Sequence, residues 1–281
     1  QKLRQALEER LGRQLQDAPP EYRDGPETYR DHIGVHAQKQ PGLYYIGAPV
    51  LVGRITSPQM KTVAELCRRY GDGKTIRLTV RQNLLLLNVP EANVEKVLIG
   101  FAEAGLSINA HPVRRSMVTC TGIEFCKLAI TETKARSRQI VEYLEKRVPL
   151  DQPLRLHVTG CPNSCAQYQI GHIGLMGSKT KVDGQVVDAY DILVGGQLGE
   201  GARFNHAVLR RIPATECAKR LEQVLLGYLR QRKEREAFND WCRRVGDAEL
   251  VKLLTDGNNH PLADAEDVPA PRVPESDGPV Y

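Results

Sequence analysis

The pattern of apolar and polar residues divides the chain into two blocks that each mix helices and strands. In the first block, residues 57–73 predict a helix with Ser57 as its N-cap and an apolar face at helical spacing. The segments around this helix are strand-rich at 31–55 and 75–90, and a second helix is predicted at 91–105. This order of elements favours a split α+β sandwich.

Strand patterns recur in the second block, at residues 114–120, 153–161, 170–178 and 186–196. The first of these strands leads into a helical pattern that runs to about residue 148, and the second leads into a short helix. Residues 214–235 predict an amphipathic helix, and two shorter helices are expected in 237–256. The second block is therefore predicted to be a mixed α/β domain.

Composition places the chain among globular proteins. Of its 281 residues, 41% are hydrophobic and 26% are charged, and no apolar run approaches the roughly 20 residues that span a bilayer. We therefore predict no membrane span. The chain starts at Gln1 rather than Met, so we expect further sequence upstream, and no secretory signal opens it. Seven cysteines without such a signal favour a reducing compartment: the cytoplasm, or a plastid stroma if a transit peptide has been removed.

Charge is unevenly distributed along the chain. The net charge is +5, yet the Pro-rich segment 257–281 carries −4, which leaves +9 on residues 1–256. A basic body attracts an anionic ligand or an acidic protein partner through long-range steering. Nucleic acid is not expected as a partner, because only 5% of the residues are aromatic and no basic run is interleaved with aromatic residues.

Three of the seven cysteines fit small core residues. Cys67 lies on the apolar face of its predicted helix, and Cys217 and Cys242 lie among the apolar residues of the predicted C-terminal helices. A free cysteine usually behaves as a small buried hydrophobic residue. We therefore predict that these three thiols have no chemical role.

The other four cysteines form two pairs, in the stretches CTGIEFC (120–126) and CPNSC (161–165), with 34 residues between them. Each pair begins where a predicted strand ends and a helix is expected to begin, with Thr121 as a possible N-cap and Pro162 suited to the first helical position. Helix N-termini offer free N–H groups and partial positive charge, which stabilise thiolates. Two such corners side by side would bring four thiolates together.

Spacing alone leaves three interpretations of these four cysteines open. A thioredoxin-like pair would have two residues between its cysteines, and structural zinc sites usually contain such close pairs, so the wide first pair fits zinc poorly. Two unequal pairs on a large α/β scaffold suit an iron–sulfur cubane better. The spacing favours a cluster over zinc, and it favours both over cysteines that merely fill the core.

The residues around the cysteines resemble the sirohaem- and [4Fe-4S]-containing nitrite and sulfite reductase family. The resemblance rests on CTGIEFCKLAITETKARS (120–137) and TGCPNSCAQYQIGHIGLMG (159–177), which match both halves of the family's cluster motif. The stretches DHIGVHAQKQPGLYYIG (31–47) and IRLTVRQNLLLLNVP (76–90) are also similar to that family. The resemblance covers about residues 28–256.

The resemblance implies an α+β fold with a ferredoxin-like half-domain followed by a mixed α/β sirohaem- and cluster-binding domain. The expected domains are an N-terminal helical and linker segment at 1–27, the ferredoxin-like half-domain at 28–112, the [4Fe-4S]/sirohaem domain at 113–256, and a disordered acidic Pro-rich tail at 257–281.

The resemblance also implies the two cofactors and their ligands. Cys120, Cys126, Cys161 and Cys165 would hold a [4Fe-4S] cluster, and Cys165 would bridge to the sirohaem iron as its axial ligand. Asn163 is expected against the macrocycle. Sirohaem carries many carboxylates, so basic side chains are expected around it. The candidates are Lys39, Arg54, Arg81, Arg114 and Arg115.

The function implied is that of the cofactor-bearing half of an assimilatory nitrite reductase, which reduces nitrite to ammonia in a six-electron reaction. The stretches TGIEFCKLAITETK and CPNSCAQ look more like ferredoxin-dependent nitrite reductases than sulfite reductases, so ferredoxin or a similar acidic donor is the expected partner. The alternatives are an assimilatory sulfite reductase, a non-catalytic subunit that carries a cluster for electron transfer, and a zinc-stabilised binding module.

The chain departs from the family in length. Family members are about twice as long and contain two pseudo-symmetric halves, and this chain resembles the second half. We therefore expect an N-terminal half or a second chain to complete the pocket. The cationic residues that hold nitrite or sulfite are expected outside this chain, so no catalytic residue is assigned within it.

Overall fold

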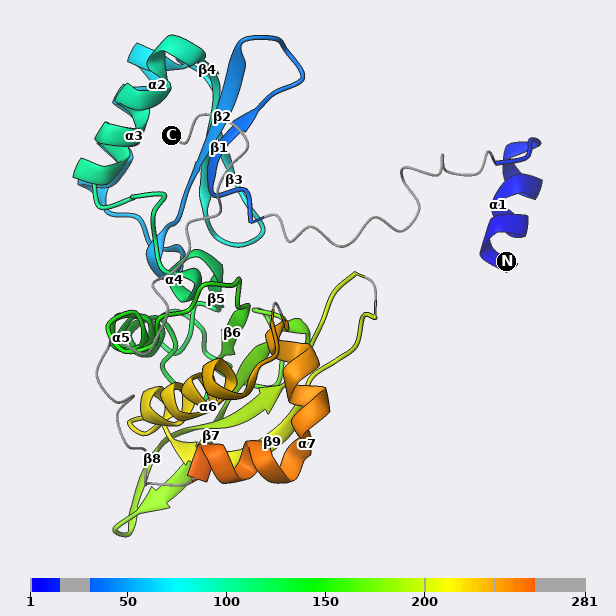
Figure 1. Ribbon diagram of the computed structural model, residues 1–281, viewed down its shortest axis with the longest axis vertical. Helices are drawn as coiled ribbons and strands as arrows, with labels where there is room; N and C mark the ends of the chain where they lie inside the picture. Colours follow the sequence, from blue (N-terminus) through cyan, green and yellow to red (C-terminus); the bar gives the residue numbers. More distant parts are fainter. Residues whose placement is uncertain (1, 16–30, 200, 235, 256–281) are drawn as a thin grey trace.

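The computed structural model describes residues 2–15, 31–199, 201–234 and 236–255, which form a short N-terminal helix and two larger units (Figure 1). The first larger unit lies above the second in Figure 1, and each has its own hydrophobic core. The predicted disordered tail 257–281 and most of the predicted linker lie outside the described residues. The domain boundaries stay predictions. Within the described residues, no helix has the length and apolar character that crossing a bilayer requires.

The first unit is an antiparallel sheet with two helices on one face. The strand order is β1-β2-β4-β3, and α2 and α3 contact β4 and β2 (Figure 1). Its elements, after the N-terminal helix α1 (Lys2–Leu11), are β1 (Gly34–Ala37), β2 (Leu43–Ala48), the 3₁₀ turn η2 (Leu51–Gly53), α2 (Ser57–Tyr70), β3 (Ile76–Leu78), β4 (Leu84–Pro90), η3 (Glu91–Asn93) and α3 (Val94–Glu103).

Helix α2 shows how local sequence sets these elements. Its N-cap is Thr56, one residue before the predicted Ser57, because Thr56 and Gln59 form a capping box in which each side chain bonds the other's backbone. Gly71 ends the helix, and its N–H donates to the carbonyl of Cys67. Cys67 is only 3% exposed, which confirms that it is a core residue.

The second unit is a five-stranded mixed sheet of order β5-β6-β7-β8-β9, in which β5, β6 and β7 are parallel and the remaining pairs are antiparallel. Helix α6 contacts both α5 and α7, so the three helices form one layer beside the sheet (Figure 1). The elements are α4 (Pro112–Ser116), β5 (Met117–Thr119), α5 (Lys134–Leu144), β6 (Leu156–Thr159), η4 (Tyr168–Ile170), β7 (Ile173–Val182), β8 (Gln185–Val194), β9 (His206–Pro213), α6 (Cys217–Gln231) and α7 (Phe238–Thr255).

The C-terminal helices close the second core through aromatic contacts. Tyr228, Phe238 and Trp241 pack with ring centroids 5.4–5.7 Å apart. Cys217 and Cys242 are buried in the same core, and burial raises the pKa of the Cys217 thiol to about 12 and that of Cys242 well above its usual value. Both thiols stay protonated at neutral pH, which confirms their prediction as core residues.

Two parts of the second unit differ from the prediction. The first three residues of the predicted strand 114–120 belong to helix α4, because Pro112 starts a helical turn that His111 caps. Strand β9 (His206–Pro213) was not predicted, and its sequence, HAVLRRIP, lacks the regular alternation of apolar and polar residues that marks a strand. The strand forms because β8 offers it an antiparallel edge, which the sequence of β9 alone does not show.

Candidate metal centre

Both cysteine pairs lie at the same edge of the second sheet. Strands β5 and β6 are parallel neighbours, with Thr119 opposite Val158, so the loops that follow them leave the sheet side by side. Cys120 directly follows β5, and Cys161 comes two residues after β6. The backbone N–H of Gly160 donates to Cys120 Sγ at 3.2 Å, which links the two loops directly. The structure therefore brings together the two corners that the sequence predicted.

The helix predicted after the first corner forms only in part, as α5 (Lys134–Leu144), and the short helix predicted directly after Cys161 is absent from the described residues there. Residues 121–133 form turns in which Gly122, with φ +71°, accepts hydrogen bonds from the N–H groups of Phe125 and Cys126. After Cys161 the chain again turns instead of forming an α-helix, because Ser164 has a left-handed backbone (φ 60°). The donor to Cys120 Sγ is therefore the backbone N–H of Gly160 and not a helix N-terminus.

Small residues allow the two loops to pack closely. The N–H groups of Ile130 and Thr131 donate to the carbonyl of Gly160 at 2.8 and 3.2 Å, so the end of the first loop folds over the second. A Cβ on Gly160 would lie 2.9 Å from the Thr131 carbonyl oxygen, and a Cβ on Gly177 would lie 2.4 Å from Thr131 Oγ1. Only glycine fits at these two positions, because any side chain would push the loops apart.

The four cysteines differ in exposure. Cys161 is buried, Cys120 and Cys126 are half-buried, and Cys165 is exposed, and all four are free thiols. The described residues contain no group of three His, Cys, Asp or Glu side chains arranged around a single metal ion. A four-iron cluster requires a wider arrangement, because each thiolate binds a different iron atom. The glycine-lined loops and the N–H donor on Cys120 fit such a cluster, with Cys165 on the open side.

The buried side chain of His157 forms hydrogen bonds with the end of the loop that carries Cys161 and Cys165. Its Nδ1 lies 2.8 Å from the carbonyl oxygen of Ala166 and 3.0 Å from that of Gln167. Burial, with smaller contributions from the charges of Arg155 and Arg81, lowers the pKa of His157 to about 4, so the ring is neutral and Nδ1–H is the donor. The sequence indicated only a strand residue here, since the carbonyl partners lie in a loop whose path it does not predict.

Three of the candidate basic residues have carboxylate partners. Arg114 makes a two-point contact with Glu145, and Arg115 makes one with Asp31, at 2.7–2.9 Å. Arg115 joins the two units, because Asp31 belongs to the first. Arg54 pairs with Glu124 and stacks 5.6 Å from the Phe125 ring centroid. Since these last two residues lie between Cys120 and Cys126, the structure places Arg54 beside the cysteine site.

The remaining candidates lie at different distances from the site. Arg81 follows β3 and is close enough to His157 and His172 to contribute to their lowered pKa values. Asn163 is exposed on the loop between Cys161 and Cys165. Lys39 is exposed in the turn between β1 and β2. The structure thus brings Arg54, Arg81 and Asn163 towards the cysteine loops, while Arg114 and Arg115 hold carboxylates.

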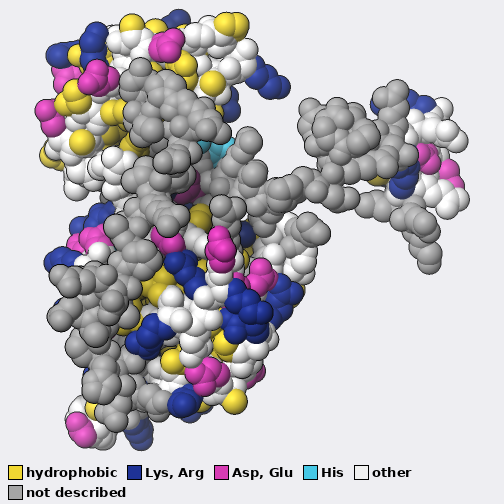
Figure 2. All heavy atoms as spheres, in the orientation of Figure 1, with side chains coloured by type: hydrophobic (Ala, Val, Ile, Leu, Met, Phe, Trp, Pro, Cys, Tyr) yellow, Lys and Arg dark blue, Asp and Glu magenta, His cyan; other side chains and the backbone are white. Residues whose placement is uncertain are grey.

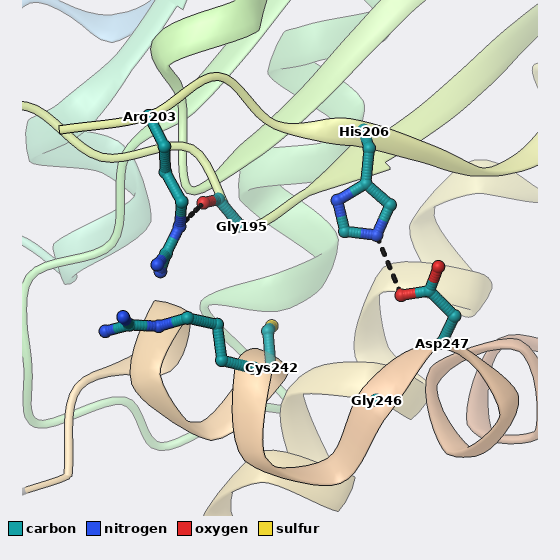
Figure 3. A pocket seen from close by; sticks show the side chains of 7 residues that line it. Gly195, Arg203, His206, Cys242, Gly246 and Asp247 are labelled. Atoms are coloured by element: carbon teal, nitrogen blue, oxygen red, sulfur yellow. Dashed lines mark hydrogen bonds and ion pairs between the residues drawn. The ribbon is translucent and has the colours of Figure 1, made fainter. Parts of the chain in front are cut away.

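A separate cavity of about 310 Å³ lies between the β8–β9 connection and α7 (Figure 3). Arg203 projects into it and donates hydrogen bonds to the carbonyls of Gly195 and Asn239, and His206 pairs with Asp247 at 2.8 Å. Arg243, which also lines the cavity, pairs with Asp240, so the charged side chains of this cavity are engaged with other residues or with the backbone. None of the residues predicted for the cofactors lines it.

The surface around the cysteine site is apolar in part. Ile123, Phe125 and Leu128, all on the first cysteine loop, are 52%, 73% and 68% exposed. On the face drawn in Figure 2, Lys and Arg side chains occur on both units and are interspersed with Asp and Glu. Several large apolar side chains on one exposed loop are typical of a surface that another molecule covers.

Comparisons with known proteins match nearly the whole described chain. The family model for the nitrite/sulfite reductase ferredoxin-like half domain matches residues 36–104, and the model for the nitrite and sulphite reductase 4Fe-4S domain matches residues 111–262. The chain is 39% identical to a ferredoxin–nitrite reductase of Synechococcus elongatus over 226 residues, and 41% identical to a chloroplastic ferredoxin–nitrite reductase of Zea mays over 212 residues. It is 34% identical to sulfite reductase [ferredoxin] 1 of Mycolicibacterium paratuberculosis over 259 residues.

These alignments cover 74–89% of this chain but only 37–46% of each relative, so the chain spans less than half the length of these proteins. Among solved structures, the Mycobacterium tuberculosis NirA protein is similar with a TM-score of 0.78 and 32% identity, over 89% of this chain and 46% of NirA. The domain matches and this similarity confirm the predicted α+β fold, with a ferredoxin-like half followed by a cluster domain. The chain belongs to the nitrite and sulfite reductase family.

Proposed function

We propose that the chain is the cofactor-bearing part of an assimilatory nitrite reductase that reduces nitrite to ammonia. The observation that carries this proposal is the pairing of the two cysteine loops at one edge of the second sheet, in a chain of the nitrite and sulfite reductase family. When bound, a [4Fe-4S] cluster and sirohaem supply the one-electron transfers that the six-electron reduction requires.

The chain's own residues would hold these groups in distinct ways. Cys120, Cys126 and Cys161 are the more buried thiols and would bind the cluster on its protein side. Cys165 is exposed, so its sulfur is available both to the cluster and to the sirohaem iron. The Gly160 N–H donates to Cys120 Sγ and thereby stabilises negative charge on that sulfur.

The site's surroundings support a pocket that another part of the protein completes. Arg54, Arg81 and Asn163 come closest to the cysteine loops and are the candidates for contacts with the macrocycle. The exposed apolar side chains of the first cysteine loop would be covered by an N-terminal half or by a second chain. That part would supply the cations that bind the substrate anion.

Nitrite is the proposed substrate, with ferredoxin or a similar acidic protein as the electron donor, in the cytoplasm or a plastid stroma. The ferredoxin–nitrite reductases of Synechococcus elongatus and Zea mays are 39% and 41% identical to this chain, against 34% for the mycobacterial sulfite reductase. Sulfite reduction is the second candidate, because that relative aligns over the larger share of the chain. A non-catalytic cluster-carrying subunit remains the third.

One set of measurements on the purified protein, in its full-length form with its partner half, separates these functions. The proposal requires a sirohaem absorption band together with iron and acid-labile sulfide, and faster turnover of nitrite than of sulfite with reduced ferredoxin. Faster turnover of sulfite would assign the second function. Iron and sulfide without sirohaem would assign the electron-transfer subunit, and zinc alone would reject all three.

Replacing Cys165 by serine tests the bridging role of this residue. We expect Cys165→Ser to retain most of the iron, because the serine oxygen can take the place of the fourth thiolate as an alanine cannot, but to weaken the magnetic coupling between the two cofactors, because the shared sulfur is gone. Electron paramagnetic resonance of the oxidised and reduced protein measures this coupling. A Cys165→Ser protein with both cofactors, unchanged coupling and full activity would exclude the bridge. Cys67→Ala, which alters a buried thiol of the first unit, is the control.

A further inference from the structure

Lys134 lies at the junction of the two units, beside the end of strand β5, which leads into Cys120. Its side chain is buried, and its ammonium group donates hydrogen bonds to the carbonyl of Val52 at 2.6 Å and to that of Thr119 at 2.9 Å. Val52 belongs to η2 in the first unit, and Thr119 is the last residue of β5. One ammonium group therefore joins both units at the peptide bond that precedes a predicted cluster ligand.

The neutral side chain of Gln82 also binds the backbone of Thr119. Its Nε2 donates to the Thr119 carbonyl at 2.8 Å, and the Thr119 N–H donates to Gln82 Oε1 at 3.1 Å. The Gln82 side chain thus pairs with the edge of β5 as a neighbouring strand would. Both Gln82 (φ 62°) and Val52 (φ 51°) have left-handed backbones, which are unfavourable for residues with side chains, and above all for a β-branched one.

The unfavourable backbone conformations of Val52 and Gln82 persist because the surrounding packing holds the contact between the two units in place. Val52 is 1% exposed and packs into the core of the second unit although it belongs to the first. Gly53 follows it with φ +67°, and a Cβ there would lie 2.7 Å from Cβ of Gln82. The segment 52–53, whose Val52 carbonyl accepts the hydrogen bond from Lys134, is therefore held by the core of the second unit and by Gln82.

The charge of Lys134 has no close counter-ion. Both of its hydrogen bonds end on carbonyl oxygens, and among the residues that the structure describes no carboxylate is within ion-pair distance of its ammonium group. Burial, then Arg54, lowers the pKa of Lys134 to about 8, while the charges of Cys120 and Glu132 oppose the shift. The group stays mainly protonated at neutral pH. A cluster held by four thiolates is anionic and gains one more negative charge on reduction, so a fixed cation beside it favours the reduced form.

We propose that Lys134 is a positioning residue that places a buried positive charge beside the cluster and thereby raises the reduction potential of the cluster. Gln82 also anchors Thr119 through hydrogen bonds, but it brings no charge. The inference rests on the proposed cluster at the four cysteines. It assigns to the junction of the two units a role in tuning the cluster, because one of the two carbonyls that hold the charge, that of Val52, belongs to the first unit.

The test compares cluster potentials, measured by redox titration with electron paramagnetic resonance, in the cofactor-loaded wild type and four variants. At a given solution potential, Lys134→Met is expected to lower the ratio of reduced to oxidised cluster about tenfold. This change is equivalent to a cluster potential about 59 mV lower for a one-electron couple. Gln82→Met removes two hydrogen bonds to Thr119 without changing charge, and should leave the potential near that of the wild type. Lys134→Arg keeps the charge and should restore it. Lys96→Met removes an exposed lysine of α3 and is the matched charge control.

Two results would overturn the inference while leaving the proposed function intact: an unchanged potential in Lys134→Met, or an equal shift in Gln82→Met, which would mean that geometry rather than charge sets the potential. If Lys134→Met retains no cluster, Lys134→Gln is measured in its place, because its amide still donates one hydrogen bond, and the same lowering is expected. A wild-type protein without iron and sulfide would instead reject the proposed function, and the inference with it.

Discussion

Replacing Cys120 by alanine is expected to remove at least about 90% of the bound iron and acid-labile sulfide, because three thiolates cannot satisfy a four-iron cluster in this site. Cys120 is also the sulfur that receives the Gly160 N–H, so its loss removes one of the hydrogen bonds that join the two cysteine loops. Iron and sulfide assays, together with the visible absorption spectrum of the purified protein, measure the effect. Nitrite reduction should fall to background in the same preparation.

The matched control for this prediction is Cys217→Ala. Cys217 is fully buried in the second core, so the substitution removes a thiol from the same unit without touching the cysteine loops. Its iron content should equal that of the wild type after correction for folded protein. Full iron content in Cys120→Ala, or equal loss in both variants, would contradict the assignment of Cys120 as a ligand.

Gly177→Ala is expected to destabilise the second unit and to reduce cofactor loading, although Gly177 contacts no cofactor in the proposal. An added Cβ would lie 2.4 Å from Thr131 Oγ1 and 2.5 Å from the Gly160 carbonyl oxygen, so the backbone beside Cys161 would have to move. Overpacking of this kind costs about 1–3 kcal/mol of unfolding free energy, and rigid backbone neighbours place this site at the upper end. Denaturant unfolding and iron content measure the two effects.

Gly184→Ala is the control for this substitution. Gly184 lies in the β7–β8 turn, and a Cβ there would meet nothing within 4 Å. Its positive φ of 79° should cost about 1 kcal/mol through backbone strain, without any effect on iron content. An equal loss of iron in both variants would show that general destabilisation, rather than displacement of the cysteine loops, controls cofactor binding.

The sequence predicted the cysteine site because the strands and the residues around the cysteines are both local signals. Strand patterns end just before Cys120 and Cys161, so a corner of the chain was predicted at each pair. The structure adds that these strands are parallel neighbours, which place their carboxyl ends at one edge and bring the two loops together. The core assignments of Cys67, Cys217 and Cys242 followed from helical spacing in the same way.

The remaining features depend on contacts between distant residues. The sequence favoured helices after both cysteine corners, yet Gly122 and Ser164 turn the backbone there, and hydrogen bonds from the end of the first loop to Gly160 hold the two loops together. Lys134 looked like an ordinary helix residue, and its burial depends on Val52, which precedes it by 82 positions. Arg115 and Asp31 are 84 positions apart. Propensity and periodicity carry no information on such pairings.

The parallel pairing of β5 and β6 would determine when during synthesis the proposed cluster could enter the protein. A parallel pair cannot form as a local hairpin, since the chain must first cross through α5 and return along β6. A ribosome-bound chain that ends before β6 holds only Cys120 and Cys126, which is half of the proposed ligand set. The proposed site is therefore complete only after β6 and the loop that follows it have been synthesised and β6 has paired with β5, and slow pairing of these distant strands would delay insertion of the cluster.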